Sequence, residues 1–172
     1  MAANNPLGTG RGFRHWRGSG TNSNGGSLFI SFPASHQVWL RFYMRYSAGF
    51  AFDGGQPHYT KDIFWHVQSG GNAIFGFSDG LLYTFTPVVN FGSNNIKSNE
   101  SWAAINGGSA GDGRFHHYEQ YINASTGQLR IWRDGKLVLD RAGVNFGRST
   151  FGEFALGENQ NYVVGGDHYT DY

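Results

Sequence analysis

The stretch RFHHYEQYINASTGQLRIWRDGKLVLD, residues 114–140, decides the fold class of this chain. Its first ten residues are rich in aromatic side chains, contain no Gly or Pro and lack the apolar spacing of a helix. A short loop ends in Gly127, and Asp134-Gly135 is typical of a type I′ hairpin turn, in which both central residues need a positive φ. The stretch therefore predicts an antiparallel meander of three strands, at 114–123, 128–133 and 136–140.

Alternation along these strands divides their side chains between two faces, because successive residues of a strand point in opposite directions. Leu129 and Ile131 share one face, and Trp132 lies on the other. Glu119 and Tyr121 also share a face. Alternation alone does not decide which face of their strand is inward, and both orientations stay open.

Residues 37–46 show the longest clean alternation in the chain. One set of side chains is entirely apolar and is expected in the core, whereas the other combines aromatic rings with guanidinium groups. The expected core set is Val38, Leu40, Phe42 and Met44, and the opposite set is Trp39, Arg41, Tyr43 and Arg45.

Turn residues and shorter strand-like segments indicate the fold class of the remaining chain. Turn residues recur at intervals of roughly 8–12 residues, and no long amphipathic helix is present. These features predict an all-β fold, an antiparallel two-sheet β-sandwich. Its further strands are expected at 28–32 (ended by Pro33), 62–68, 73–77, 81–86, 151–156 and 162–164, with one helical turn near 101–105.

The composition fits one domain that needs no covalent cross-link. The chain has 172 residues, enough to bury a core, and no cysteine, which excludes disulfides, thiol nucleophiles and thiolate metal sites. Its 27 glycines indicate many tight turns, and its 17% aromatic content favours strands and ligand-facing surfaces. No apolar run is long enough to span a membrane, so no membrane partner is expected.

The first 26 residues differ in composition from the remainder. They are mostly Gly, Asn, Ser and Arg around Phe13 and Trp16. We predict an N-terminal arm over 1–26, held either on its own sandwich or on identical or different subunits, followed by a sandwich domain over 27–172. The start of the sequence shows no signal peptide, so we expect an extracellular or virion-surface location reached by another route, such as release by phage lysis.

Two further segments join the meander in carrying a family resemblance. VWLRFYMRY at 38–46 is similar to an early strand of polysaccharide-lyase-like proteins, and FALGEN at 154–159 with DHYTDY at 167–172 is similar to two closing strands. Together with the meander they resemble the concanavalin A-like lectin/glucanase superfamily, also called the laminin-G-like jelly roll, nearest to its polysaccharide-lyase-like and binding-module members. The resemblance implies a jelly-roll sandwich. It does not fix an activity, since the superfamily holds lectins, binding modules, hydrolases, lyases and structural domains.

The aromatic and guanidinium stripe suggests a ligand-binding surface. Aromatic rings pack against the apolar faces of sugars, and carboxylates or guanidinium groups bond to their polar substituents. Our first hypothesis is a non-catalytic, lectin-like glycan-binding or surface-display domain, one component of an assembly such as a phage virion, where it would be a decoration or tail protein. The candidate ligand-binding residues are Trp39, Arg41, Tyr43, Arg45, His66, Glu119, Tyr121 and Trp132.

Two other functions stay open. Retaining glycoside hydrolysis needs two carboxyl groups about 5–5.5 Å apart, and no two Glu residues share a strand at i, i+2 or i+4, which disfavours a hydrolase. A polysaccharide lyase acting on uronate-containing glycans needs a group that neutralises the carboxylate and a base for the C5 proton. Arg41, Tyr43 and His66, expected on adjacent strands, would form that set. A purely structural virion or filament subunit is the third hypothesis.

Metal and nucleic-acid motifs are weak. His116 and His117 are neighbours on a strand and therefore point to opposite faces, and no H-E-x-x-H or EF-hand string occurs. The superfamily resemblance implies a structural calcium site built from acids near both chain ends, which here would draw on Asp167, Asp171 and carbonyl oxygens. We expect no other cofactor. The few Arg and Trp residues at 11–17 do not suffice to predict nucleic-acid binding.

Overall fold

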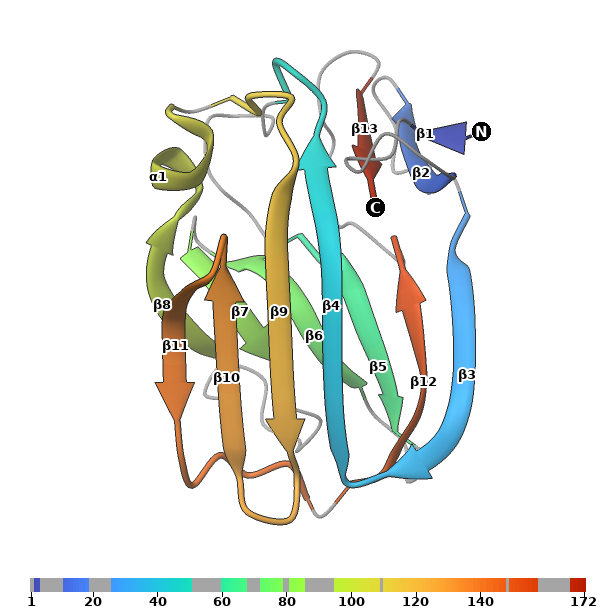
Figure 1. The fold of residues 1–172 in the computed structure, drawn as a ribbon, viewed down its shortest axis with the longest axis vertical. Helices are drawn as coiled ribbons and strands as arrows, with labels where there is room; N and C mark the ends of the chain where they lie inside the picture. The colour runs from blue at the N-terminus through green and yellow to red at the C-terminus, as the bar shows by residue number, and fades with distance from the viewer. Residues whose placement is uncertain are drawn as a thin grey trace.

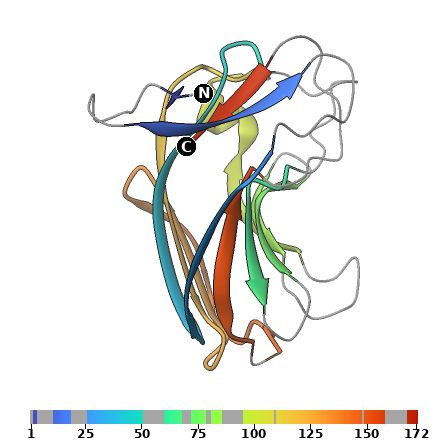
Figure 2. The ribbon, with the colours of Figure 1, turned by 90° about the vertical axis from the view of Figure 1, so that its right-hand side faces the viewer.

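The computed structural model describes residues 2–3, 11–18, 26–50, 60–67, 72–78, 81–85, 95–108, 110–147, 149–157 and 168–172. These residues form thirteen strands and one short helix. The strands make two antiparallel sheets packed face to face (Figures 1 and 2). The predicted all-β two-sheet sandwich is confirmed.

The seven-stranded sheet has the order β1-β2-β13-β4-β9-β10-β11, and its strands β4, β9 and β10 lie in front of the second sheet in Figure 1. The bounds are β1 Ala2–Ala3, β2 Gly12–Gly18, β4 Gln37–Tyr46, β9 His116–Asn123, β10 Gln128–Arg133, β11 Lys136–Arg141 and β13 His168–Asp171.

The six-stranded sheet has the order β3-β12-β5-β6-β7-β8 and packs behind the first. The one helix among the described residues, α1, follows β8 directly and is too short to cross a membrane. The bounds are β3 Leu28–Ser35, β5 Ile63–Val67, β6 Asn72–Ser78, β7 Leu81–Phe85, β8 Asn95–Ser101, α1 Trp102–Asn106 and β12 Phe151–Leu156.

The predicted meander is confirmed as β9, β10 and β11, paired antiparallel in sequence order. Its second turn has positive φ at both central residues, 49° at Asp134 and 79° at Gly135, as a type I′ hairpin requires. The structure also decides the orientation of β9. Tyr118 and Ile122 are buried between the sheets, so Glu119 and the other odd-numbered residues of this strand point outward.

The core lies between the two sheets and consists largely of aromatic rings. A buried hydrogen bond crosses this core, since Trp65 Nε1 of β5 donates to Gln120 Oε1 of β9 at 2.6 Å and both side chains are at most 2% exposed. Leaving the Trp65 N–H unpaired at this depth would cost about 1–3 kcal/mol. This bond joins an interior strand of one sheet to an interior strand of the other.

Two of the sequence predictions concern the first strands of the chain. Pro33 does not end the first strand, because β3 continues to Ser35; β3 is an edge strand, where a residue without an N–H is tolerated. Within the predicted arm over 1–26, residues 12–18 form strand β2, which pairs with β13 of the sandwich. The predicted strand at 162–164 lies outside the described residues.

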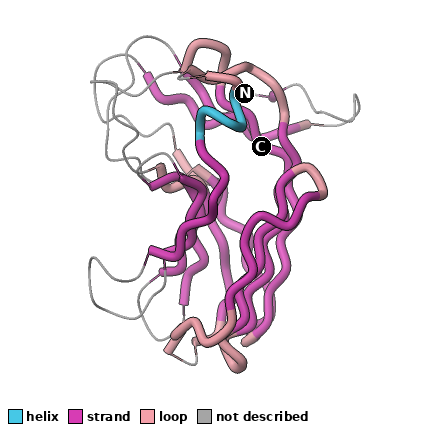
Figure 3. The backbone as a smooth tube through the Cα atoms, turned by 90° about the vertical axis from the view of Figure 1, so that its left-hand side faces the viewer, coloured by secondary structure: helices cyan, strands magenta, loops and turns pink. Residues whose placement is uncertain are grey.

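One side of the sandwich is closed by an ionic cluster. Glu100 of β8 accepts hydrogen bonds from Arg133 of β10 (2.9 and 3.1 Å) and from Lys136 of β11 (2.8 Å). Burial raises the pKa of Glu100, but these cationic donors outweigh burial and hold it below the usual value. Figure 3, seen from this side, shows the two layers facing each other with the helix at one end.

A buried carboxylate joins the two ends of the chain. Asp171 of β13 is fully buried and accepts from Arg14 of β2 (2.6 and 2.9 Å) and from Arg45 of β4 (2.8 Å). The Arg14 guanidinium also lies over the Tyr169 ring, 3.6 Å from its centroid. One negative charge thus connects three neighbouring strands.

We expect Asp171→Asn to destabilise the protein by about 3–5 kcal/mol, because the change leaves two partly buried guanidinium groups without their counter-charge. Asp140→Asn is the matched control, since Asp140 pairs with Arg130 where both side chains are more than 40% exposed, and such pairs contribute about 0–1 kcal/mol. Urea unfolding at neutral pH measures both variants. Equal losses would show that the buried cluster has no special role.

A second buried carboxylate accepts hydrogen bonds from two neutral hydroxyl groups. Asp62 Oδ2 accepts from the Tyr46 hydroxyl and from Thr60 Oγ1, both at 2.6 Å, and all three residues are buried. Burial, together with the nearby Asp62 charge, raises the pKa of Tyr46 well above its usual value. The fold therefore keeps this phenol protonated.

We expect the stability that Tyr46 contributes to be complete below about pH 10 and to decline as the pH rises further, since the unfolded chain releases the phenol proton first. Tyr46→Phe should lower stability at pH 7 by about 1–3 kcal/mol and lose less stability between pH 9 and 11 than the wild type. Urea unfolding across this range measures the difference, with exposed Tyr43→Phe as control. Parallel pH profiles for Tyr46→Phe and wild type would contradict the assignment.

Candidate functional site

The outer face of the seven-stranded sheet brings together most of the predicted ligand-binding residues. Strands β4, β9 and β10 are neighbours, and their register sets Trp39 opposite Tyr121, and Arg41 opposite Glu119. Trp132 of β10 also pairs with Glu119 from the other side. We call this surface the aromatic face; its residues are Trp39, Arg41, Tyr43, His117, Glu119, Tyr121 and Trp132.

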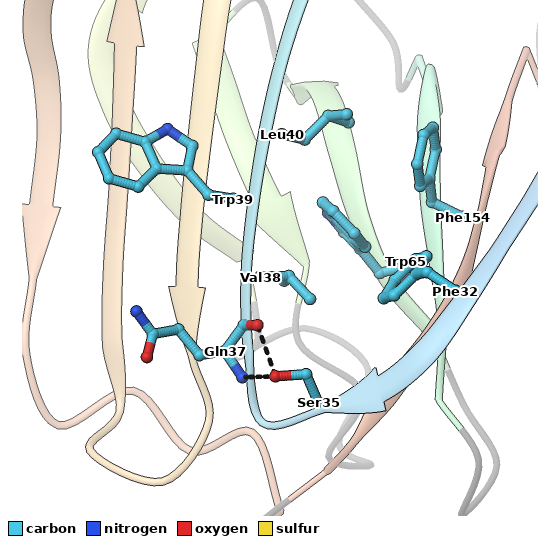
Figure 4. A pocket seen from close by; sticks show the side chains of 8 residues that line it. All are labelled: Phe32, Ser35, Gln37, Val38, Trp39, Leu40, Trp65 and Phe154. Atoms are coloured by element: carbon cyan, nitrogen blue, oxygen red, sulfur yellow. Dashed lines mark hydrogen bonds between the residues drawn. The ribbon is translucent and has the colours of Figure 1, made fainter.

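The Trp39 indole is the most prominent group on the aromatic face, with 60% of the residue exposed. It stacks on Trp132, with centroids 5.8 Å apart and planes inclined by 12°, and meets the edge of Tyr121 at 5.7 Å. In Figure 4 the indole extends from β4 over β9, away from the core residues Val38 and Leu40. Its position is therefore fixed by other rings while much of its surface stays open to ligand.

Glu119 links this indole to a cation. Its Oε2 accepts a hydrogen bond from Trp39 Nε1 at 3.1 Å and lies 3.3 Å from Arg41 Nε. The Glu119 side chain is only 14% exposed, whereas that of Arg41 is 68% exposed. The carboxylate thus orients the ring, and the guanidinium extends into solvent where a ligand can reach it.

A tyrosine and a histidine lie beside this group. The rings of Tyr43 and His117 are 5.0 Å apart, and His117 Nδ1 is 4.0 Å from Glu119 Oε1. His117 is not among the ligand-binding residues predicted from the sequence, where it is considered only as a metal ligand beside His116. The signal was its spacing: His117 stands two residues before Glu119 and must share its face.

His66 does not join the aromatic face, and the expectation that it lies on a strand adjacent to Arg41 and Tyr43 is wrong. Its strand β5 belongs to the six-stranded sheet, between β12 and β6, whereas β4 lies between β13 and β9. Trp65 points into the core, so His66 points to the opposite outer surface, where it contacts Glu153 at 2.8 Å. Alternation gave the correct face of each strand but could not assign the strand to a sheet.

Arg45 lies on the predicted side of β4 but has a structural partner. Its guanidinium binds Asp171 and lies over the Phe115 ring, 4.5 Å from the centroid, so it does not reach the Trp39 indole. The same contacts bear on the predicted calcium site. Both Asp171 oxygens accept from guanidinium groups, which place positive charge where a cation would bind. The second predicted ligand, Asp167, lies outside the described residues.

A small hollow opens on the side of the sandwich opposite the Glu100 cluster, between β4 and the β3 and β12 strands (Figure 4). Its volume is about 230 Å³. Ser35 lies at one end, where its hydroxyl donates to the Gln37 carbonyl at 2.8 Å and accepts from the Gln37 N–H at 3.0 Å. The apolar lining residues are Phe32, Val38, Leu40, Trp65 and Phe154.

Comparison with known proteins identifies the fold. No protein-family model and no curated protein matches the sequence. Among solved structures, the alginate lyase Aly36B superposes with a TM-score of 0.57 at 18% identity, covering 94% of this chain and 78% of its own. A heptameric SAP-like pentraxin from Limulus polyphemus gives 0.52 at 16% identity, covering 92% and 72%.

A third solved structure is the binding domain of botulinum neurotoxin DC in complex with SialylT, with a TM-score of 0.58 at 16% identity. The superposition covers 99% of this chain but only 40% of the chain in the toxin structure. At such identities the likeness concerns the fold alone. The order of the strands and these likenesses together show that the chain has the concanavalin A-like jelly-roll fold, as the sequence resemblance predicted.

Proposed function

We propose that the protein binds glycans through the aromatic face. The observation that carries this proposal is the Trp39 indole, which is 60% exposed and yet held by Trp132, Tyr121 and the Glu119 carboxylate. A large ring that is exposed but already fixed loses little conformational entropy when a ligand covers it. Its flat face suits the C–H side of a sugar ring, which is apolar.

The polar groups around the indole can form hydrogen bonds with the hydroxyl and carboxylate groups of a sugar. Arg41 offers donors to hydroxyl or carboxylate oxygens, and Glu119 and Tyr121 offer acceptors and a phenol at the border of the ring. Solved proteins of the same fold include an alginate lyase and a toxin binding domain bound to SialylT. They support the proposal only as examples of what this fold can carry.

Isothermal titration against neutral and uronate-containing oligosaccharides tests the proposal. We expect at least one to bind, and Trp39→Ala to weaken it at least tenfold, equivalent to about 1.4 kcal/mol. Trp39→Phe should retain part of the affinity because it keeps a ring. Trp16→Ala is the matched control, since Trp16 is 36% exposed on strand β2, two strands away from β4.

Equal affinity of the wild type and Trp39→Ala would contradict binding at the aromatic face. Failure of the whole panel to bind would reject glycan binding and leave the structural role in an assembly, the third hypothesis from the sequence.

One observation favours a polysaccharide lyase as the second candidate function. Tyr43 and His117 lie 5.0 Å apart beside Arg41, so the base and the cation that β-elimination requires are on one face. Arg41 would neutralise the uronate carboxylate, and His117 or Tyr43 would take the C5 proton as the C4–O bond breaks and the C4–C5 double bond forms. The leaving oxygen would receive a proton from the other member of the pair.

If this second function holds, uronate polymers will yield the ultraviolet absorbance of an unsaturated product. His117→Ala and Tyr43→Phe should each lower the rate about a hundredfold or more. Trp16→Ala should leave it unchanged, because Trp16 lies on β2, two strands away from β4. No rise in absorbance with any uronate polymer, or full activity in both His117→Ala and Tyr43→Phe, would exclude this mechanism.

A further inference from the structure

The outer surface of the six-stranded sheet carries a polar cluster that none of the functions above uses. Strands β3, β12 and β5 are neighbours there, and the register sets Glu153 of β12 between Ser31 of β3 and His66 of β5. The three side chains thus lie in one row across three strands. We call them the Glu153 row.

Hydrogen bonds hold the Glu153 carboxylate in place. Oε2 accepts from Ser31 Oγ at 2.9 Å, and Oε1 lies 2.8 Å from His66 Nδ1. The side chains of Glu153 and His66 are still 33% and 29% exposed. The carboxylate is therefore oriented from both sides and open to solvent at its front.

The backbone leaves a depression at this row. The pairing of β12 with both neighbours shifts register between Phe151 and Glu153, and the residue at the shift is Gly152, which has no side chain to fill the space. A hollow of about 190 Å³ results, lined by the Glu153 row together with Val67 and Gly152. This is smaller than the roughly 300–1,000 Å³ of typical ligand pockets and suits a single small ring.

An exposed aromatic ring stands beside the hollow. Phe29 of β3 is 51% exposed, and its centroid is 5.8 Å from that of His66 with the planes inclined by 56°. Phe29 pairs with Ala155 of β12, which in turn pairs with Phe64 of β5. These two residues of the same surface are buried, since Phe64 is 6% and Ala155 0% exposed. Phe29 is therefore an uncovered ring at the margin of a covered surface, next to an oriented carboxylate.

The order of the hydrogen bonds excludes a nucleophilic triad. In such a triad a histidine lies between the hydroxyl and the carboxylate, so that it can take the hydroxyl proton. Here the carboxylate lies in the middle, and Ser31 donates to Glu153 instead of to His66. The arrangement presents acceptors and donors but does not activate Ser31.

The Glu153 row with Phe29 repeats the chemistry of the aromatic face. There an exposed indole lies beside Glu119, with His117 next to that carboxylate. Here an exposed phenyl ring lies beside Glu153, with His66 next to it. The two groups lie on opposite outer surfaces of the sandwich, because their strands belong to different sheets.

We infer that the Glu153 row and Phe29 form a second sugar-binding site that accepts one pyranose residue. The inference rests on the proposed glycan binding for its class of ligand. Glu153 accepts hydrogen bonds from ring hydroxyls, Ser31 and His66 border it, and the apolar face of the sugar covers Phe29. A protein with sites on both outer surfaces holds two glycan chains at once and cross-links them.

Nuclear magnetic resonance of the whole chain tests the second site, with the methyl glycosides of glucose, galactose, mannose, N-acetylglucosamine and glucuronic acid as probes. We expect at least one probe to shift the amide signals of Phe29, Ser31 and Glu153, separately from the Trp39 indole signal. Phe29→Ala and Glu153→Gln should each weaken the first response at least tenfold and change the Trp39 response less than twofold. Trp39→Ala should abolish the Trp39 indole signal and change the response of Phe29, Ser31 and Glu153 less than twofold.

Each outcome decides between the two sites. Probes that move only the Trp39 signal overturn the second site and leave the aromatic face intact. Probes that move only Phe29 and the Glu153 row reject the aromatic face and leave the second site standing, and no response at either place rejects both. Glu153→Gln keeps the side-chain shape, so unchanged signals elsewhere in its spectrum confirm that a lost response is not a loss of fold.

Discussion

The register between β4 and β9 is the constraint on which the rest of the molecule depends. Because alternate residues of a strand face opposite ways, the same pairing that buries Val38 and Ile122 must expose Trp39 and Tyr121. A slip of one residue would place charged side chains in the core and apolar ones in water. Packing of the core therefore sets the positions of the residues of the aromatic face, although the core itself would touch no ligand.

Buried polar pairs add precision that apolar packing lacks. The Trp65–Gln120 bond fixes how the two sheets sit against each other, and the Asp171 cluster fixes β2 and β13 beside β4. Each such group is costly to leave unpaired, so alternative packings that separate the partners are penalised. The same buried contacts also restrict the outer surfaces of the two sheets. Their rings and carboxylates keep fixed positions because the strands beneath them cannot shift independently.

The sequence predicted the meander, the two faces of β4 and the fold class because these follow from local periodicity and turn chemistry. It did not predict β2, since a Gly-rich composition resembles a free arm until its partner strand, 157 residues away, is known. It also placed His66 beside Arg41, because alternation assigns faces and not sheets. The structural partner of Arg45 was hidden for the same reason: an ion pair between distant strands leaves no local pattern.

The pairing of β2 with β13 has a consequence for how the protein is made. The Arg14–Asp171 bond joins residues 157 apart, so at ribosomal rates β2 waits on the order of ten to thirty seconds for its partner. During that wait the backbone groups of the nascent segment that later pair with β13 are open to pairing with other chains. The stretch 1–26, which contains this strand, is rich in Gly, Asn and Ser and poor in aliphatic side chains, a composition that disfavours aggregation during such a delay. The composition that disguises this strand in the sequence also protects it during translation.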